Sequence, residues 1–310
     1  MFHLTEDEIR RQLDPVRVIA TIEAAFRDRY PAITIPLRSH IPLCDGVFLI
    51  MPCYDRSGGV LGMKLVTVLN NPPRAEDRIH ATYMLLDPAS ACPKLIIPAN
   101  HLTDLRTAAT SAVATKFLAR EDAQVLGIFG TGRQARAHMK VLPLVRQFRR
   151  ALVCGRNSEP TRKFADEMSV ELNLPVEPVD AKTCAAESDV ICTCTTAQAP
   201  LFDGHLLRPG THLNLVGAFQ PHTREVDSAT IQRSRMVVDT YEAVLAEAGD
   251  ILIPMNEGLI THDHLLANLH ELTAGKKSIR RSAADITLFK SVGCALEDLV
   301  TAELLQPAQA

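Results

Sequence analysis

The sequence lacks the features that mark membrane, secreted and nucleic-acid-binding proteins. No uncharged apolar run reaches the roughly 18 residues typical of a membrane-spanning helix. Residues 1–8 are acidic and contain no long apolar core, so we expect no secretory signal. The 33 basic residues are outnumbered by 36 acidic ones, and the net charge of −3 argues against a broad basic face. We therefore expect no membrane partner and no nucleic-acid partner.

The eight cysteines form neither a disulfide framework nor a complete zinc pattern. They are scattered along a chain for which we expect no export, which favours free thiols and a cytoplasmic location. Cys192 and Cys194 could supply half of a metal site. However, the segment around them reads as a strand, in which residues i and i+2 share a face and can simply pack. Because no second Cys/His pair stands at zinc-like spacing, we expect no metal site.

Two patterns of apolar residues divide the chain, whose 310 residues are enough for about two domains. Residues 1–30 read as helical, and residues 35–98 contain short apolar runs separated by turn residues, which is typical of an antiparallel sheet. Residues 103–119 then read as one long helix. From about residue 124, strands alternate with helices, which indicates a parallel sheet with helices on its faces. Residues 286–305 read as a single last helix.

A glycine-rich turn follows the first strand of this alternating region. Residues 125–129 form a buried-strand pattern, Gly130-Thr131-Gly132-Arg133-Gln134-Ala135 follows at once, and a helical run comes next. This is the G-x-G-x-x-A form of the dinucleotide fingerprint. Gly130 permits the tight turn, Gly132 lets the backbone approach a pyrophosphate, and Ala135 allows close packing of helix on strand. A turn that binds nothing is the alternative, but the strand–turn–helix context favours dinucleotide binding.

The tip of the next strand bears on the choice of coenzyme. NAD-binding domains usually carry an acidic residue there, which binds the ribose hydroxyls. This chain has Gly155-Arg156-Asn157-Ser158 instead. Arg156 is complementary to a 2′-phosphate, with Asn157 and Ser158 as further donors. NADP(H) is therefore favoured and NAD(H) remains possible; a solvated loop arginine is the alternative reading.

Five stretches resemble the ornithine cyclodeaminase/mu-crystallin family, in order along nearly the whole chain. They are residues 62–66, 102–112, 129–135, 216–227 and 289–298. The resemblance implies an α/β fold in which a Rossmann doubly wound parallel sheet domain is inserted into an α/β domain with a mainly antiparallel sheet. The Rossmann domain, residues 119–289, would bind NAD(P). Residues 1–118, completed by 290–310, would bind the substrate and form a homodimer.

The family pattern also implies site residues. Arg38, Lys64 and Arg106 should converge on a substrate carboxylate, with charge-assisted bonds of about 1.5–3 kcal/mol each, and Lys64 and Arg106 are the catalytic candidates. Arg38 could instead be a surface arginine and Arg106 part of a structural ion pair. The other expected substrate contacts are Met51, Phe219 and Val292. The expected cofactor contacts are Thr82, Arg106, Thr110, Gly130, Thr131, Gly132, Arg133, Gln134, Gly155, Arg156, Asn157, Thr195, Thr196, Val216, Gly217, Ala218 and Ser291.

Two positions depart from the pattern of the cyclodeaminase. That enzyme has an aspartate in the loop Gly-Gly-Asp-Cys-Pro, where this chain has Phe219, and a glutamate where this chain has Leu49. An apolar pocket with a carboxylate grip suits an imino acid better than a diamino acid. We therefore expect NAD(P)H-dependent reduction of a small cyclic imino acid such as Δ1-pyrroline-2-carboxylate or Δ1-piperideine-2-carboxylate. The alternatives are an ornithine cyclodeaminase or related amino-acid dehydrogenase, and a non-catalytic mu-crystallin-like binding protein.

Overall fold

Two short helices lie near the start of the chain, and local capping residues determine where they begin. The structure is a computed structural model that describes residues 2–72, 74 and 78–305. Helix α1 (Glu6–Gln12) begins after Thr5, which forms a capping box with Glu8. Helix α2 (Pro15–Ala24) begins after Asp14, whose carboxylate accepts a hydrogen bond from the Arg17 N–H at 3.0 Å. A π-helical turn (Ala25–Arg29) and a 3-10 turn (Tyr30–Ala32) then end the segment.

The chain divides into two compact units. The first comprises Met1–Thr110 with Gly293–Ala310, and the second comprises Ser111–Val292. Helix α3 (Asn100–Leu118) contains the first boundary. Among the described residues, no helix combines the length and the apolar character needed to cross a bilayer.

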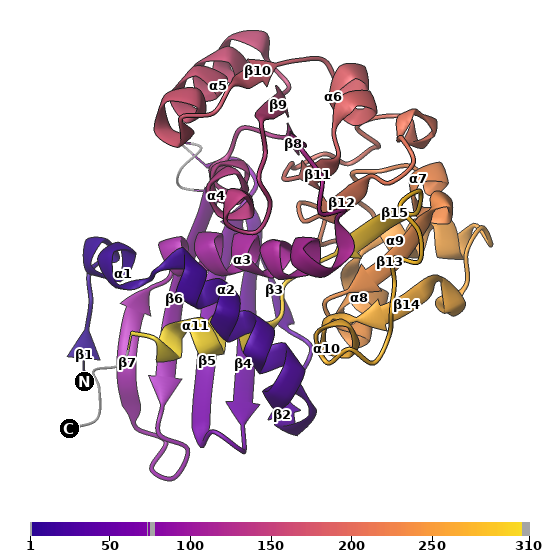
Figure 1. Cartoon of the computed structure of the whole chain (residues 1–310). Coiled ribbons are helices and arrows are strands. Elements are labelled where there is room, and N and C mark those ends of the chain that lie inside the picture. The colour runs from indigo at the N-terminus through magenta and orange to yellow at the C-terminus, as the bar shows by residue number, and fades with distance from the viewer. Residues whose placement is uncertain (1, 73, 75–77, 306–310) are drawn as a thin grey trace. The chain divides into compact units, whose positions relative to one another are not determined.

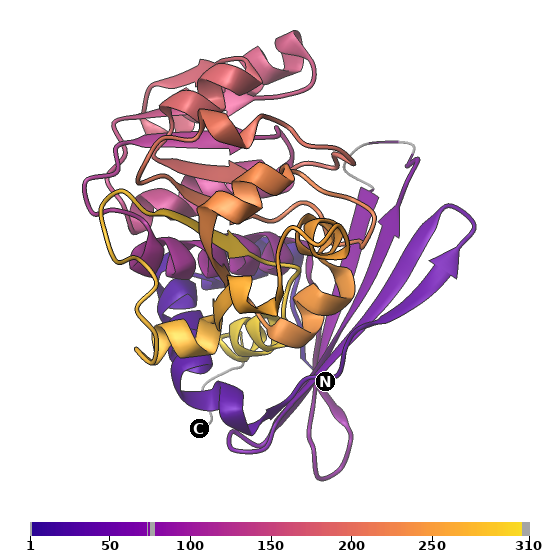
Figure 2. The ribbon, with the colours of Figure 1, turned by 90° about the vertical axis from the view of Figure 1, so that its right-hand side faces the viewer.

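A mainly antiparallel sheet forms the centre of the first unit. Its strand order is β1-β7-β6-β5-β4-β2, with β3 also paired to β4 (Figure 1). Figure 2 shows the strands of this sheet in a view turned by 90°. All neighbours are antiparallel except β1 and β7. The strands are β1 (Phe2–His3), β2 (Ile33–Thr34), β3 (Ser39–Leu43), β4 (Gly46–Asp55), β5 (Val60–Leu69), β6 (Ile79–Leu86) and β7 (Pro93–Pro98).

One face of this sheet carries the core of the first unit. Alternate residues of β4 are buried, Leu49, Met51 and Cys53 among them, and register places Lys64 of β5 opposite Met51. The C-terminal helix α11 (Ala295–Glu303) packs on β4, β5 and β6 and against α2 (Figure 1). The period-two burial follows from the alternation of side chains across a strand.

The expectation of one helix over residues 286–305 is wrong. Residues Ile286–Lys290 form strand β15, which is buried along its whole length, and α11 begins only at Ala295. The five residues of β15 mix apolar side chains with Thr287 and Lys290, and a run this short has no periodicity that separates a buried strand from part of a helix. Gly293, at φ +93°, adopts the left-handed backbone between these two elements.

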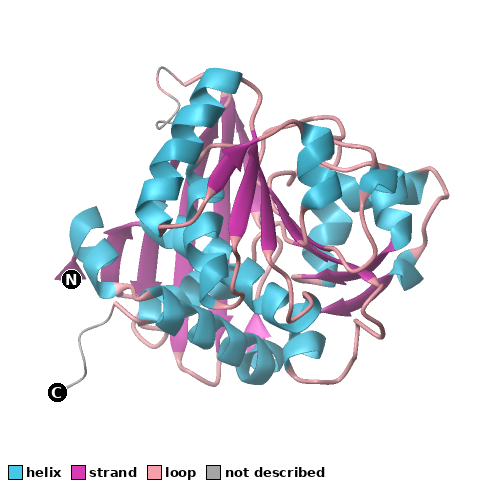
Figure 3. Ribbon diagram, turned by 45° about the horizontal axis from the view of Figure 1, so that its top comes forward, coloured by secondary structure: helices cyan, strands magenta, loops and turns pink. Residues whose placement is uncertain are grey.

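A parallel sheet forms the centre of the second unit, with helices on both of its faces (Figure 3). Its order is β10-β9-β8-β11-β12-β15-β13-β14, so the direction of winding reverses between β8 and β11. The strands are β8 (Val125–Phe129), β9 (Arg150–Cys154), β10 (Val176–Pro178), β11 (Val190–Thr193), β12 (His212–Leu215), β13 (Ser234–Val238), β14 (Leu265–Asn268) and β15. The helices are α4 (Arg133–Val141), α5 (Ser158–Leu172), α6 (Ala181–Glu187), α7 (Ser228–Arg233), α8 (Tyr241–Glu247), α9 (Gly249–Asn256) and α10 (Leu269–Thr273). The expected α/β fold class is confirmed.

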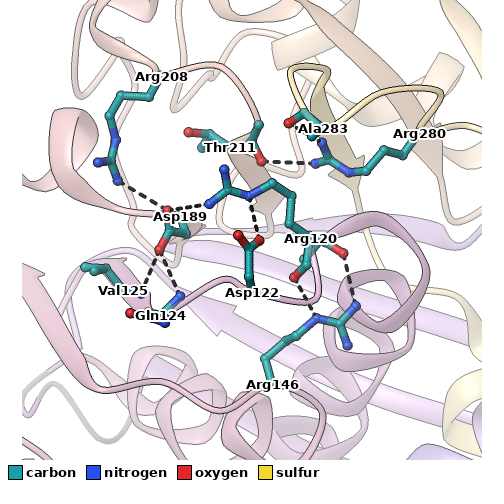
Figure 4. A network of polar contacts seen from close by, with 12 residues as sticks. Arg120, Asp122, Gln124, Val125, Arg146, Asp189, Arg208, Thr211, Arg280 and Ala283 are labelled. Atoms are coloured by element: carbon teal, nitrogen blue, oxygen red, sulfur yellow. Dashed lines mark hydrogen bonds and ion pairs between the residues drawn. The ribbon is translucent and has the colours of Figure 1, made fainter.

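A polar network fixes the amino ends of β8 and β11 (Figure 4). One carboxylate oxygen of Asp189 accepts hydrogen bonds from the N–H groups of Gln124 and Val125 at 2.8 and 3.0 Å. The other lies 3.2 Å from the guanidinium of Arg120 and 3.3 Å from that of Arg208. Since β8 begins at Val125 and the glycine turn follows its other end, this network lies at the edge of the sheet opposite to the turn.

Candidate active site

The glycine turn after β8 adopts the conformation that a dinucleotide requires. Gly130 has φ +112°, and a Cβ there would stand 2.5 Å from the carbonyl oxygen of Cys194. Gly132 is the N-cap of α4, and a Cβ on it would meet no atom within 4 Å. Its Cα therefore faces open space at the start of a helix, where backbone N–H groups and the helix dipole favour an anion. Ala135 is fully buried, as its packing role predicts.

Three further loops meet the glycine turn at this carboxyl edge of the sheet. A Cβ on Gly155, just after β9, would lie 3.0 Å from the side chain of Thr131. A Cβ on Gly130 would lie 3.5 Å from the side chain of Thr195, which follows β11. Gly217, after β12, approaches Thr195 so closely that its Cβ would stand 2.2 Å from the Thr195 carbonyl. The structure thus brings the expected cofactor residues of these four loops together.

These loops suit a dinucleotide. They lie where the winding of the sheet reverses, which is the usual ligand crevice of a doubly wound sheet. Arg156 and Asn157 are exposed beside Gly155, so the cation is available to a ribose phosphate. Thr196 is likewise exposed. Arg133 and Gln134 form the first turn of α4, directly after Gly132.

The loop after β15 is held by a buried carboxylate that sequence reasoning missed. Asp239 accepts hydrogen bonds from the Ser291 hydroxyl at 3.1 Å and from the Val292 N–H at 2.7 Å. Ser291 and Val292 are both buried. Val216 and Ala218 follow the neighbouring strand β12, and Phe219 packs against the apolar core of the second unit.

A buried cluster of four charges lies in the first unit. The Lys64 ammonium donates to Asp298 at 2.8 Å, and Arg106 Nε lies 2.9 Å from the same carboxylate. Arg106 Nη1 forms an ion pair with Glu297. Lys64 comes from β5, Arg106 from α3 and both acids from the first turn of α11. All four are at most 5% exposed. Two cations are therefore matched by two anions, as buried charges require.

The pKa values of the two cations are shifted in opposite directions. Burial and the nearby charge of Arg106 lower the pKa of Lys64 to about 8, although Asp298 acts in the opposite direction. Burial also disfavours the charge of Arg106, but Asp298 and Glu297 outweigh it and raise the pKa of that guanidinium. Arg106 is thus a permanent cation, while Lys64 can exchange a proton at mildly basic pH.

Glu297 and Asp298 entered the sequence analysis only as part of the family signature, without a role. A pair of acids in the first turn of a largely apolar helix is the signal that could have identified them, because a buried acid needs a cation. Gly293 lies beside this cluster. A Cβ on Gly293 would stand 3.1 and 3.3 Å from the two terminal nitrogens of Arg106, so the glycine leaves room next to the guanidinium.

The other expected site residues of the first unit are distributed over both faces of its sheet. Met51 pairs with Lys64 on the buried face. Thr82 is exposed and lies on the opposite face, because its strand neighbour Tyr83 is the partner of Lys64. Thr110 is buried one turn after Arg106 and donates to the Arg106 carbonyl at 2.8 Å. Arg38 is half-buried and directly precedes β3, whose first residue pairs with Ile50 of β4.

Comparison with known proteins places the chain among small-molecule oxidoreductases. A Δ1-pyrroline-2-carboxylate reductase of Bacillus cereus is 34% identical over 98% of this chain and 95% of its own length. The ketimine reductase mu-crystallin of Rattus norvegicus is 33% identical over 97% and 95%.

Solved structures agree. The Thermococcus litoralis Δ1-pyrroline-2-carboxylate reductase in complex with NADH and L-proline superposes with a TM-score of 0.94 at 38% identity, over 98% of this chain and 96% of the other. An archaeal alanine dehydrogenase dimer with bound NAD gives 0.92 at 26% identity, over 98% and 94%. The model of the ornithine cyclodeaminase/mu-crystallin family matches residues 2–308. The chain belongs to the ornithine cyclodeaminase/mu-crystallin family.

Proposed function

We propose that this protein is an NAD(P)H-dependent reductase of a small cyclic imino acid, with Δ1-pyrroline-2-carboxylate and Δ1-piperideine-2-carboxylate as the leading substrates. The observation that carries the proposal is the buried pair Lys64 and Arg106, linked through Asp298, in a chain with a complete dinucleotide turn. A fixed cation and a titratable cation suit a substrate with one permanent carboxylate and one basic nitrogen. The relatives named as reductases of such imines support the same reaction.

In this proposal, the coenzyme binds at the carboxyl edge of the parallel sheet in the second unit. When bound, NAD(P)H supplies the hydride that reduces the imine carbon. The turn at Gly130 and Gly132 would hold the pyrophosphate, together with Arg133 and Gln134 in the first turn of α4. The exposed Arg156 would bind a 2′-phosphate, which favours NADPH over NADH. The thermococcal neighbour was solved with NADH, so use of both nucleotides is consistent with the family.

In this proposal, the cations of the first unit bind the substrate carboxylate. Arg106 is held by Glu297 and Asp298, so its guanidinium is oriented before substrate arrives. Arg38 is the proposed second donor to that carboxylate. This pre-ordering is positioning catalysis, in which the site fixes the imine carbon for hydride transfer. Phe219 and Val292 stay predicted substrate contacts on the basis of the family pattern.

Lys64 is the proposed source of the proton. Its pKa of about 8 keeps it largely protonated at neutral pH. Transfer of that proton to the imine nitrogen, together with hydride addition to carbon, gives the amine. Asp298, at 2.8 Å, then holds the neutral lysine in place until solvent restores the proton.

Cyclisation of ornithine is disfavoured by two apolar side chains. Leu49 is buried on the Lys64 face of the sheet, where the cyclodeaminase has a glutamate. Phe219 replaces the aspartate that the cyclodeaminase uses. A non-catalytic binding protein has no need of a proton donor, whereas Lys64, with its pKa lowered to about 8, can act as one.

A substrate panel tests the proposal. The purified protein is assayed for NADPH and NADH oxidation with the five- and six-membered cyclic imino acids, and with pyruvate plus ammonia, which an amino-acid dehydrogenase would reduce. We expect the cyclic imines to give the higher kcat/KM. A preference for pyruvate plus ammonia would assign the protein to the dehydrogenases.

A homodimer is also proposed. Three large apolar side chains on or beside β3 are exposed: Leu37, Ile41 and Leu43, at 53, 44 and 41%. An exposed apolar patch of this kind marks a surface that a protein partner covers. The archaeal alanine dehydrogenase, a dimer, supports pairing of two chains.

A further inference from the structure

Glu225 is a buried carboxylate that joins two loops of the second unit. It is fully buried in the segment between β12 and α7. Its Oε1 accepts from the N–H and the hydroxyl of Thr195 at 2.8 and 2.7 Å. Its Oε2 accepts from the Thr193 hydroxyl at 2.7 Å, and from the N–H groups of Gly217 and Ala218 at 2.7 and 3.3 Å. One side chain therefore ties the end of β11 to the loop after β12.

Two further buried charges hold Glu225 in place. Asp250 of α9 accepts hydrogen bonds from the N–H groups of Glu225 and Val226 at 2.7 and 3.2 Å. Its second oxygen lies 2.8 Å from the ammonium of Lys290, at the end of β15. Lys290 also donates to the carbonyl of Ala218 at 2.6 Å. The contacts close a ring, because Ala218 is itself bound to Glu225.

The backbone around Glu225 is fitted to this contact. A Cβ on Gly217 would stand 2.4 Å from Glu225 Oε1 and 2.2 Å from the Thr195 carbonyl, so only glycine allows the two loops to approach the carboxylate. Burial and Asp250 raise the pKa of Glu225, while Lys290 and the hydroxyls of Thr193 and Thr195 oppose that shift. Burying three charges costs stability that apolar residues of similar volume would not, which points to a function for the ring.

In the proposed function, the two loops lie in the half of the sheet that would serve the nicotinamide. A doubly wound sheet binds a dinucleotide across its switch point, with one nucleotide on each half. The glycine turn and Arg156 belong to the half with β8, β9 and β10, whereas Thr195 and Gly217 follow β11 and β12 on the other side. Glu225 touches only this second half.

We propose that Glu225 is a positioning residue for the nicotinamide half of the coenzyme. The inference rests on the proposed function. Glu225 does not touch the coenzyme; it sets the backbone at residues 195–196 and 216–218, and Asp250 and Lys290 fix its carboxylate. Loosening it should misplace the nicotinamide while the adenine half remains bound.

Binding of whole coenzymes and of their fragments tests this role. NADPH and NADH are titrated by calorimetry beside 2′-phospho-ADP-ribose and ADP-ribose, which keep the pyrophosphate but lack the nicotinamide. Glu225→Gln has nearly the same volume but turns an amide N–H₂ toward N–H donors. We expect its Kd for the coenzyme to rise about 10- to 100-fold, with a fall in kcat, and its Kd for the fragment to stay within about twofold. The matched control Glu177→Gln, exposed on β10, should change neither.

A milder pair of variants guards against misfolding of Glu225→Gln. Thr193→Val removes the hydroxyl that donates to Glu225 at nearly constant volume, whereas Thr193→Ser keeps a hydroxyl at that position. We expect Thr193→Val to weaken coenzyme binding about 3- to 10-fold relative to the fragment, and Thr193→Ser to bind both as the wild type does. Equal loss of coenzyme and fragment, or no change in either, would overturn the role of Glu225.

The outcomes also separate this inference from the proposed function. A wild-type protein that binds coenzyme and fragment but reduces no imine would contradict the proposed reaction. The ratio of the Kd for the coenzyme to the Kd for the fragment, compared between Glu225→Gln and the wild type, would still test the role of Glu225. A wild-type protein that binds no nucleotide would overturn both.

Discussion

Arg106 is a permanent cation. Two carboxylates orient it, and its pKa is raised, so it presents the same cation at any working pH. Arg106→Ala should lower kcat/KM for the cyclic imine roughly 10- to 100-fold, equivalent to about 1.5–3 kcal/mol for one lost charged bond. Steady-state NADPH oxidation measures the effect, and Arg149→Ala, at an exposed position just before β9, is the control. Unchanged kcat/KM in Arg106→Ala would remove this residue from the site.

Lys64 should impose a pH dependence on the reaction. Its pKa is lowered to about 8, so the protonated form is lost as pH rises through 8, and kcat/KM should fall in that range. The imine substrate also titrates, so Lys64→Met is the control, and the fall near pH 8 should be absent from the activity it retains. An identical pH profile in wild type and variant would exclude Lys64 as the proton donor.

The lowered pKa of Lys64 should affect stability in the opposite direction to kcat/KM as the pH rises. Between about pH 8 and the ordinary lysine value of 10.5, the unfolded chain holds a proton that the folded protein has released. The contribution of Lys64 to the free energy of unfolding therefore increases with pH across this window. Activity and stability should diverge there, which separates loss of the proton donor from unfolding.

At the scale of elements, local signals were sufficient for the fold class. The strand–turn–helix at residues 125–141 and the capping box of Thr5 and Glu8 depend on neighbours in sequence, and both are found in the structure. Strand β15 was missed because five residues are too few for their pattern to separate a buried strand from part of a helix.

The site was less predictable because its partners lie far apart along the chain. Lys64 and Asp298 are separated by 234 residues, and no periodicity connects them. The ring of Glu225, Asp250 and Lys290 is likewise assembled from the segment before α7, from α9 and from β15. Family resemblance named the cations, but only the three-dimensional structure identifies the carboxylates that hold them.

The loop after β9 should determine which coenzyme binds more tightly. Arg156 is exposed at its tip, and no acid replaces it in residues 155–158. We expect a lower Kd for NADPH than for NADH, and Arg156→Ala should weaken NADPH selectively, by about 10-fold or more for one lost charged contact. Calorimetry with both nucleotides measures the difference. Equal affinities in the wild type would contradict this assignment.

At the scale of the whole molecule, two chains should pair. The exposed apolar side chains of Leu37, Ile41 and Leu43 motivate the expectation, since C2 pairing covers one patch with its own copy. Light scattering at micromolar concentration should give twice the chain mass of 34.0 kDa. Replacing Ile41 and Leu43 by serine should shift the mass toward the monomer, whereas Val170→Ser, an exposed position on α5, should not. A monomeric wild type would refute the pairing.

The central claim is that the chain reduces a cyclic imine and does not cyclise ornithine. Chromatography of two parallel reactions tests it most directly: Δ1-pyrroline-2-carboxylate with NADPH, and ornithine with NAD⁺. With Leu49 and Phe219 where the cyclodeaminase has acids, we predict proline from the first reaction, one per NADPH consumed, and little or none from the second. Proline and ammonia from ornithine at the higher rate would contradict the claim.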